Sequence, residues 1–180
     1  MLSHLARETV ASVFREISPS LTFLYDVAHS IGKMEEHVVD GRLVKVLVHR
    51  KGAIRAFGSG ARHPRGVPRV GQLVLVPGDM GRDSYLPAGT TDEMELAFAS
   101  ACHGAGRAMS RSAAKKSLSA EALSRQLSRE GILVRSATVA GLVEEAPSAH
   151  KDVENTVAAT ADAVFALKVA RLRPMGAIKG

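Results

Sequence analysis

The chain has 180 residues, the length of one ordinary domain, and 46% of them are hydrophobic, enough to form a buried core. A single cysteine excludes a disulfide scaffold and a Cys-rich zinc module, and 4% aromatic residues without tryptophan argue against a base-stacking platform. The net charge of +6 is compatible with a polyanionic partner. No apolar run approaches the roughly 20 residues that span a bilayer, and acidic residues interrupt the first stretch, unlike a targeting peptide. We expect a soluble, cytoplasmic chain with no membrane partner.

In the first half of the chain, the hydrophobic spacing predicts one helix and several strands. Apolar residues three and four positions apart predict an amphipathic helix over residues 2–17, which ends before Pro19. Residues 57–71 hold four glycines and two prolines and are predicted to form a loop. Short apolar runs predict strands at residues 21–27, 42–48 and 73–76.

In the second half, residues 92–100 predict a helix that leads into a glycine turn at residues 104–106. Ser119 is the predicted N-cap of the next helix, and Gly131 its predicted end. Two further elements are predicted, a strand over residues 132–139 and a long last helix over residues 153–168. Helices and strands mix without a regular βαβ rhythm, so we predict a single α+β domain over residues 1–180.

Positive charge is concentrated in two segments. Residues 42–78 contain eight Lys and Arg and no carboxylate, and residues 107–129 contain six, with only Glu121 opposing them. Phosphates pair with such side chains and release counterions, which favours a nucleic acid or nucleotide partner. An ordinary basic surface is an equal alternative on charge alone.

The densest group of candidate chemical residues is CHGAGR, residues 102–107. The alternating glycines after His103 allow backbone N–H groups to approach a ligand closely, as phosphate-binding turns require. If a helix begins here, Arg107 and Arg111 share a face and point at anions. The alternative is a glycine turn beside an unrelated histidine. Cys102 is a candidate nucleophile, but neighbouring side chains seldom face each other, so His103 is poorly placed to activate it and a buried thiol is the preferred interpretation.

Three further segments could contact a ligand. His29 follows an apolar run and is either a metal ligand or an ordinary structural histidine. Residues 49–51, His-Arg-Lys, place three potential cations at a strand end, for oxyanion binding or as a solvated edge. Residues 77–85 form a glycine-hinged loop after a strand, which suits a ligand-contacting loop or a surface turn.

Taken together, these strings resemble the RtcB family of RNA ligases, which join RNA ends in transfer-RNA splicing and repair. The most specific match is SACHGAGRAMSRSAAKK at residues 100–116. The matches follow the family's order with near-family spacing, and they correspond to the carboxyl-terminal portion of its ligase domain. The other matching segments are LYDVAHSIGKMEEH (24–37), VHRKGAIRAF (48–57), VGQLVLVPGDMGRDSY (70–85), GLVEEAPSAHKDV (141–153) and VARLRPMGAIKG (169–180).

The resemblance implies a GTP- and Mn²⁺-dependent ligation. The family's histidine attacks the α-phosphate of GTP and passes GMP to an RNA 3′-phosphate, and a 5′-hydroxyl on a second RNA, such as a tRNA half or a broken RNA, then displaces GMP. By motif match His103 is the nucleophile, His29 a manganese ligand, and Lys51 and Arg111 are RNA-phosphate contacts. The implied nucleotide contacts are Ser30, Pro77, Gly78, Asp79, Met80, Ser84, Gly104, Ala105, Gly106, His150 and Lys179.

This sequence departs from the family pattern at three implied nucleotide positions. Ser30 replaces the usual Asn, and His150 replaces a tyrosine that could stack on guanine. Asp79 replaces a Ser found in many members, and its charge beside a phosphate is unfavourable unless a metal ion or Arg82 compensates for it. We expect these changes to affect nucleotide affinity more than the type of reaction.

The largest departure is that the family's amino-terminal metal motif and Gly-rich Asn-His motif have no counterpart here. One histidine cannot build a two-metal site, so we expect a truncated gene product, one half of a split ligase or a fragment. Such a chain would need an amino-terminal ligase half as partner and would expose the apolar faces that pack against it. The alternative function is a noncatalytic, basic RNA-binding module derived from the ligase. Only the ligase reading predicts a GMP adduct on His103 once the missing half is supplied. A cysteine hydrolase using Cys102 predicts hydrolysis that iodoacetamide inhibits.

Overall fold

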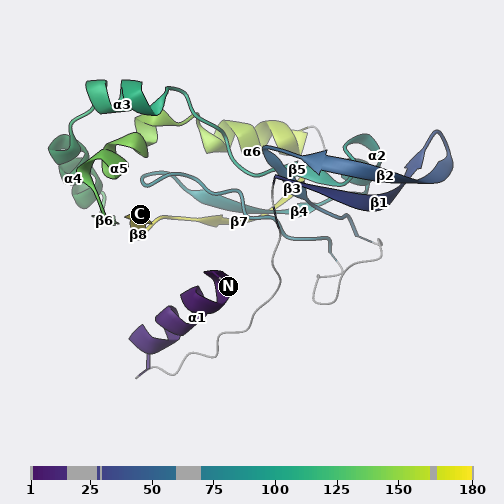
Figure 1. Ribbon diagram of the computed structural model, residues 1–180, viewed down its shortest axis with the longest axis horizontal. Coiled ribbons are helices and arrows are strands. Elements are labelled where there is room, and N and C mark those ends of the chain that lie inside the picture. Colours follow the sequence, from purple (N-terminus) through teal and green to yellow (C-terminus); the bar gives the residue numbers. More distant parts are fainter. Residues whose placement is uncertain (1, 16–27, 29, 60–69, 163–165, 180) are drawn as a thin grey trace.

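A computed structural model describes residues 2–15, 28, 30–59, 70–162 and 166–179 (Figure 1). It mixes helices with small sheets, which confirms the predicted α+β class. The elements, in chain order, are α1 (Leu2–Val13), β1 (Ile31–Val39), β2 (Arg42–Arg50), β3 (Ala53–Arg55), β4 (Ser84–Gly89), α2 (Thr91–Leu96), β5 (Ser100–Cys102), α3 (Arg111–Ser117), α4 (Ala120–Arg129), β6 (Leu133–Ser136), α5 (Val139–Glu144), the 3₁₀ helix η1 (Pro147–Ala149), α6 (Val153–Asp162), β7 (Ala166–Leu172) and β8 (Gly176–Lys179).

The described strands form four two-stranded sheets. β1 and β2 make a long antiparallel hairpin, β3 pairs with β5 and β4 with β7, both antiparallel, and β6 pairs with β8 in parallel. Isolated bridges join Leu73 to Ala88 and Val76 to Tyr85, so the predicted strand at residues 73–76 is present only as two bridges beside β4.

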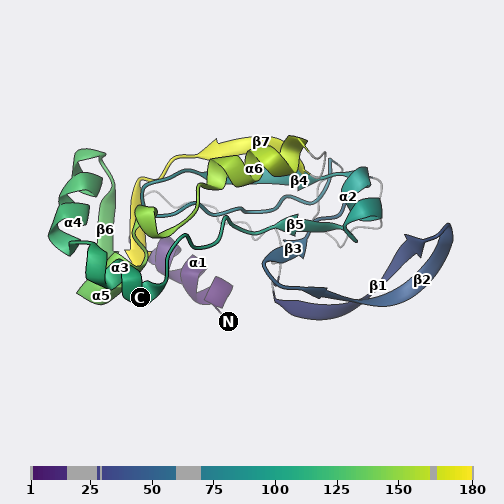
Figure 2. The ribbon, with the colours of Figure 1, turned by 90° about the horizontal axis from the view of Figure 1, so that it is seen from above.

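Two apolar clusters form the core. The first lies between the β3–β5 and β4–β7 sheets and α6, and the second is built around α4, β6 and the segment before β4. Figures 1 and 2 show α3, α4 and α5 gathered at one end of the molecule and the β1–β2 hairpin projecting at the other. The buried members of the first cluster are Ile54, Ala56, Val74, Val76, Tyr85, Ala101, Val153 and Val157, and those of the second are Met80, Leu123, Leu127, Ile132 and Ala146.

Several predicted element boundaries are confirmed. The strand predicted at residues 42–48 is β2, and the first predicted helix is α1, although Val13 ends it within the described residues. Ser119 caps α4, since its Oγ accepts the Ala122 N–H at 3.3 Å, and Gly131 follows the helix with a φ of +76°. The predicted strand at residues 21–27 and most of the predicted loop at residues 57–71 lie outside the described residues.

Other predicted helices are too long. The helix predicted over residues 92–100 ends at Leu96, because Phe98 and Ala99 have left-handed backbone angles (φ +50° and +51°), and β5 begins at Ser100. The last helix ends at Asp162, and residues 166–172 form β7, which pairs with β4. β6 likewise stops before α5, so the strand predicted to residue 139 is shorter than expected. No described helix is long and apolar enough to cross a membrane.

Candidate functional site

The candidate nucleophile follows a short strand of the core. β5 pairs with β3 so that Cys102 lies opposite Ala53, and the chain then leaves the sheet at the half-buried His103. Gly106 has a φ of +76°, a conformation that favours glycine. An added Cβ at Gly104 or Gly106 would meet nothing within 4 Å. The turn therefore has open space beside its glycines, where a ligand could approach the backbone.

The thiol next to this histidine belongs to the core. Cys102 packs against the first apolar cluster, and its Sγ lies 3.5 Å from Thr160 Oγ1 on α6. A hydroxyl is not a general base, so this contact does not activate a thiol. The geometry favours the structural interpretation of Cys102 over the cysteine-hydrolase alternative.

The loop before β4 is closed by its own side chains. Ser84 Oγ accepts the Gly78 N–H at 3.0 Å, and Asp79 Oδ1 accepts the N–H groups of Gly81 and Arg82, each at 2.9 Å. The Asp79 side chain is only 5% exposed, and its other oxygen lies 3.5 Å from the Arg82 guanidinium. The negative charge of Asp79 is therefore compensated inside the loop by Arg82, one of the two compensating groups expected from the sequence.

Arg82 connects this loop to a second segment. Its Nη1 donates to the carbonyl oxygens of His150 and Lys151, at 3.3 and 3.0 Å. The Lys151 N–H in turn donates to the Gly106 carbonyl at 3.0 Å, and Arg107 pairs with His150 as an isolated bridge. The structure thus brings together three predicted segments, at residues 77–84, 104–107 and 150, that are far apart in the sequence.

Arg107 serves this assembly as an internal donor. Its Nη2 donates to the Glu144 carbonyl at 2.7 Å, and its Nη1 to the Glu145 carboxylate at 3.3 Å. The ring of His150 lies 3.5 Å from the same guanidinium, and its Nδ1 lies 3.2 Å from the Ala146 carbonyl. The anion that Arg107 contacts is therefore the protein's own Glu145 carboxylate. Because α3 begins only at Arg111, Arg107 and Arg111 do not lie on the same helix.

Arg111 lies at the exposed end of a charged group between α3 and α5. Its Nε is 3.6 Å from Glu144, whose carboxylate also pairs with Lys115. The hydrogen bond from Lys115 is the largest cause that holds the pKa of the Glu144 carboxyl below its usual value, and Arg111 adds to it. The Arg111 side chain is 69% exposed and remains accessible to a phosphate.

The remaining predicted residues differ in their surroundings. Ser30 is exposed before β1 with a φ of +55°, and Lys51 is exposed in the turn between β2 and β3. Met80 is buried in the second apolar cluster and contributes packing, while Pro77 is exposed. Lys179 lies in β8, where its carbonyl accepts the Ala137 N–H at 2.9 Å. The predicted manganese ligand, His29, lies outside the described residues.

One basic residue of the predicted oxyanion site at residues 49–51 is not available to a ligand. The Arg50 side chain is 2% exposed and donates to both oxygens of Glu35, at 2.9 and 2.7 Å. It also donates to Ser100 Oγ at 2.9 Å and to the Phe98 carbonyl at 2.7 Å. The sequence did not indicate this role, because the Glu35 carboxylate that neutralises Arg50 lies on the other strand of the hairpin.

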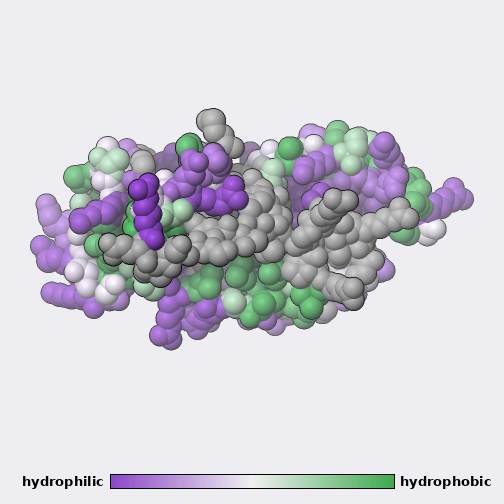
Figure 3. Space-filling view, turned by 90° about the horizontal axis from the view of Figure 1, so that it is seen from below, coloured by the Kyte–Doolittle hydropathy of each residue, from purple (hydrophilic) through white to green (hydrophobic). Residues whose placement is uncertain are grey.

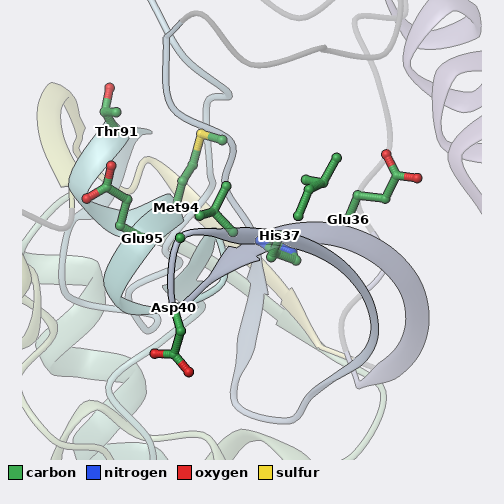
Figure 4. Close-up of a pocket in the computed structure, with 9 residues that line it drawn as sticks. Glu36, His37, Asp40, Thr91, Met94 and Glu95 are labelled. Carbon is green, nitrogen blue, oxygen red and sulfur yellow. The ribbon is translucent and has the colours of Figure 1, made fainter.

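The described part of the chain contains no group of three or more His, Cys, Asp or Glu side chains that could hold a metal ion. These residues therefore do not fit a manganese site on their own. A cavity of about 470 Å³ between α2 and the hairpin is lined by apolar side chains, among them Val38, Leu43 and Met94, and by three carboxylates at its edge, which do not suit phosphates (Figure 4). The three carboxylates are those of Glu36, Asp40 and Glu95.

Comparison with known proteins decides the family. The family model "tRNA-splicing ligase RtcB" matches residues 1–180. The chain belongs to the RtcB family. Proteins named tRNA-splicing ligase RtcB from Pyrococcus abyssi and Thermococcus kodakarensis are each 48% identical to it, and one from Methanococcus maripaludis is 46% identical, each over the whole of this chain.

The RtcB chain described here spans only part of these relatives. The matched residues make up 20% of the P. abyssi protein and 38% of both the T. kodakarensis and M. maripaludis proteins. The relatives thus contain much additional polypeptide, which is consistent with the prediction that this chain corresponds to a portion of the family's ligase.

Two acidic residues of the site were not singled out from the sequence. Glu144 and Glu145 bind Arg107, Arg111 and Lys115 and so determine how the basic segment is oriented. The signal that could have identified them is an adjacent acidic pair in a matching segment, GLVEEAPSAHKDV, which also contains the predicted site residue His150.

Proposed function

We propose that this chain provides the nucleophilic histidine and most of the nucleotide pocket of a GTP- and Mn²⁺-dependent RNA ligase. The observation that carries the proposal is the convergence of the glycine turn after His103, the loop at residues 77–84 and His150 in an RtcB-family chain. These are the segments that the family resemblance assigns to the nucleotide.

His103 is the proposed site of the covalent step. A neutral imidazole nitrogen attacks the α-phosphate of GTP, so that a P–N bond forms and the bond to pyrophosphate breaks. The GMP group then moves to an RNA 3′-phosphate. An RNA that ends in a 2′,3′-cyclic phosphate first acquires this 3′-phosphate by hydrolysis. Attack by a 5′-hydroxyl forms the phosphodiester and releases GMP. The backbone of residues 104–106, with open space beside its glycines, is the proposed cradle for the phosphates.

Manganese would offset charge on the phosphates and on the leaving pyrophosphate. His29 is the one ligand that we propose from this chain, and the described residues hold no metal cluster. We propose that the other ligands come from additional polypeptide. We therefore propose an amino-terminal ligase portion as an obligatory partner, in agreement with the greater length of the relatives. RNA, as tRNA halves or broken strands, is the proposed substrate, with Lys51 and the exposed Arg111 as phosphate contacts.

The test is transfer of label from α-labelled GTP in the presence of Mn²⁺. The chain is assayed alone and after coexpression with the unmatched amino-terminal portion of the T. kodakarensis relative. We expect an acid-labile label on the chain only in the coexpressed sample. The label should be lost in His103→Ala and retained in His4→Ala, which removes an exposed histidine on α1. Label on the chain alone would contradict the need for a partner, and retention of label in His103→Ala would exclude His103 as the nucleophile.

The alternative is a noncatalytic RNA-binding module derived from the ligase. It is favoured by the same lack of a metal cluster among the described residues, together with the exposed basic side chains on α3. This alternative predicts RNA binding without any label on His103, even in the presence of a bound amino-terminal portion.

A further inference from the structure

The outer face of the β1–β2 hairpin carries two exposed apolar pairs of side chains. Opposite residues of two antiparallel strands lie on the same face, and the register pairs Met34 with Leu47 and Val38 with Leu43. All four side chains are more than half exposed, from 56% at Met34 and Leu47 to 68% at Leu43. Figure 3 shows apolar and hydrophilic residues interleaved at this end of the molecule.

The opposite face of the hairpin holds its buried residues, both near the base and near the tip. His37, Val48 and Arg50 are each at most 9% exposed. The apolar residues of the outer face are therefore not needed for packing within the described part of the chain. Exposed apolar pairs of this kind, here on either side of the Glu36–Lys45 pair, mark an interaction surface, since leaving them in water forgoes their burial energy.

The chemistry of this face selects a protein partner. Its only charged pair, Glu36 and Lys45, stands directly opposite across the strands, so the face has no net charge. Nucleic acid binding requires a surplus of cations, which this face lacks. At the tip, Val38 and Leu43 also line the cavity of about 470 Å³ beside Met94, which offers an anchoring place for an apolar side chain (Figure 4).

The hairpin is tied to the strand that precedes the candidate nucleophile. The buried Arg50 at the end of β2 bonds to Glu35 on β1 and to Ser100 and the Phe98 carbonyl at the start of β5. β5 leads directly into His103. A partner that binds the outer face of the hairpin is therefore held in a fixed relation to the glycine turn.

We propose that the outer hairpin face, defined by Met34, Val38, Leu43 and Leu47, is the docking surface for the amino-terminal portion of the ligase. This inference rests on the proposed function, which requires such a partner. It is supported by the coverage of the relatives: this chain aligns over its whole length, yet accounts for 38% of the T. kodakarensis protein, so more than half of that protein is available to cover the face.

The test is copurification after coexpression. The tagged full chain is coexpressed with the unmatched amino-terminal portion of the T. kodakarensis relative, and the mass of the recovered species is measured by light scattering. We expect a 1:1 complex with the unaltered chain and a loss of recovered partner of about tenfold or more with Leu47→Lys, since burying a charge in place of an apolar contact side chain is costly. The matched control is Leu133→Lys, which places the same charge on β6, where Leu133 is 64% exposed at the other end of the molecule.

Three results would overturn the proposal: no complex with a chain whose circular dichroism is that of a folded protein, equal recovery with Leu47→Lys, or equal losses with both leucine variants. A homodimer of the chain alone that Leu47→Lys dissociates would also overturn it, because it would assign the face to a second copy. His103→Ala separates this inference from the proposed function, since it should abolish the GMP label and leave the complex intact.

Discussion

Arg50 is a buried arginine whose charge is neutralised by a buried carboxylate. Its guanidinium and the Glu35 carboxylate are 2% and 7% exposed and form two hydrogen bonds with each other. Removing one member of a buried pair leaves an uncompensated charge, so we expect Arg50→Met to lower the free energy of unfolding by about 3–5 kcal/mol. Urea denaturation measures this loss. Arg111→Met removes an arginine whose ion pair is exposed, and it should barely move the urea midpoint; equal losses would show that burial does not decide the cost.

The same pair predicts how stability depends on pH. Burial is the largest influence on Glu35 and raises its pKa, but hydrogen bonds from Arg50 and His37 together outweigh it, so the pKa lies below the ordinary 4.5. A carboxyl with a lowered pKa contributes stability above its unfolded pKa and loses that contribution as the pH falls through its folded pKa. Thermal unfolding measured from pH 6 downward should therefore show a steep loss below about pH 4.5. Glu35→Gln should flatten that loss, and an unchanged slope would assign it to other carboxyls.

At the scale of elements, the loop at residues 77–84 depends on one side chain. Asp79 accepts two backbone N–H groups and faces Arg82, which in turn holds the His150 segment. We expect Asp79→Ala to cost about 2 kcal/mol of unfolding free energy, since two bonds to a charged acceptor are lost. Asp79→Asn keeps one acceptor oxygen and should cost less. If both variants unfold at the urea midpoint of the unaltered chain, the loop is held by other contacts.

The α3 element provides a prediction about RNA. If Arg111 contacts a phosphate, Arg111→Ala should weaken binding of a single-stranded RNA and reduce the slope of log K against log salt by about 0.7. Fluorescence anisotropy with an RNA that carries a 3′-phosphate, at several salt concentrations, measures both quantities. Arg125→Ala is the control, because Arg125 is an exposed arginine on α4, outside the charged group around Glu144. Equal effects of the two variants would indicate a general effect of charge.

Local signals predicted the elements that local chemistry determines. The cap at Ser119, the stop at Gly131 and the apolar run of β2 all carry their information within a few residues, and these predictions are confirmed. The predicted last helix runs into the first residues of β7, 166–168, because their strand state depends on pairing with β4, about 80 residues away along the chain. Arg50 is predicted either to bind an oxyanion or to lie on a solvated edge, because no local pattern shows that Glu35 will neutralise it.

At the scale of the whole molecule, the site depends on contacts between distant segments. The motif at residues 102–107 and the loop at residues 77–85 are visible in the sequence as glycine-rich candidates. Their meeting through Arg82 and His150 is not, because it depends on a bridge and three backbone acceptors that only the fold creates. The sequence therefore indicates the candidate residues, and the structure shows how their segments are held together.

The two apolar clusters should unfold as one unit. Val76 belongs to the first and Met80 to the second, and Asp79 and Arg82 fix the short loop on which Met80 lies. We expect Leu127→Ala, a fully buried position in the second cluster, to cost about 2–5 kcal/mol. In a Tyr25→Phe background, Tyr85 is the only remaining tyrosine, so its fluorescence reports on the first cluster.

If the clusters are coupled, Leu127→Ala lowers the urea midpoint seen by Tyr85 fluorescence as much as the midpoint seen by far-ultraviolet circular dichroism, since coincident probes indicate a two-state transition. Val157→Ala, in the first cluster, is the reciprocal variant and should also shift both signals together. A helical signal that melts early while the Tyr85 signal keeps its midpoint would mean that the α4 end unfolds separately. The loop at residues 77–84 would then join two independent units, and the nucleotide pocket proposed between its segments would require the docked partner to keep it assembled.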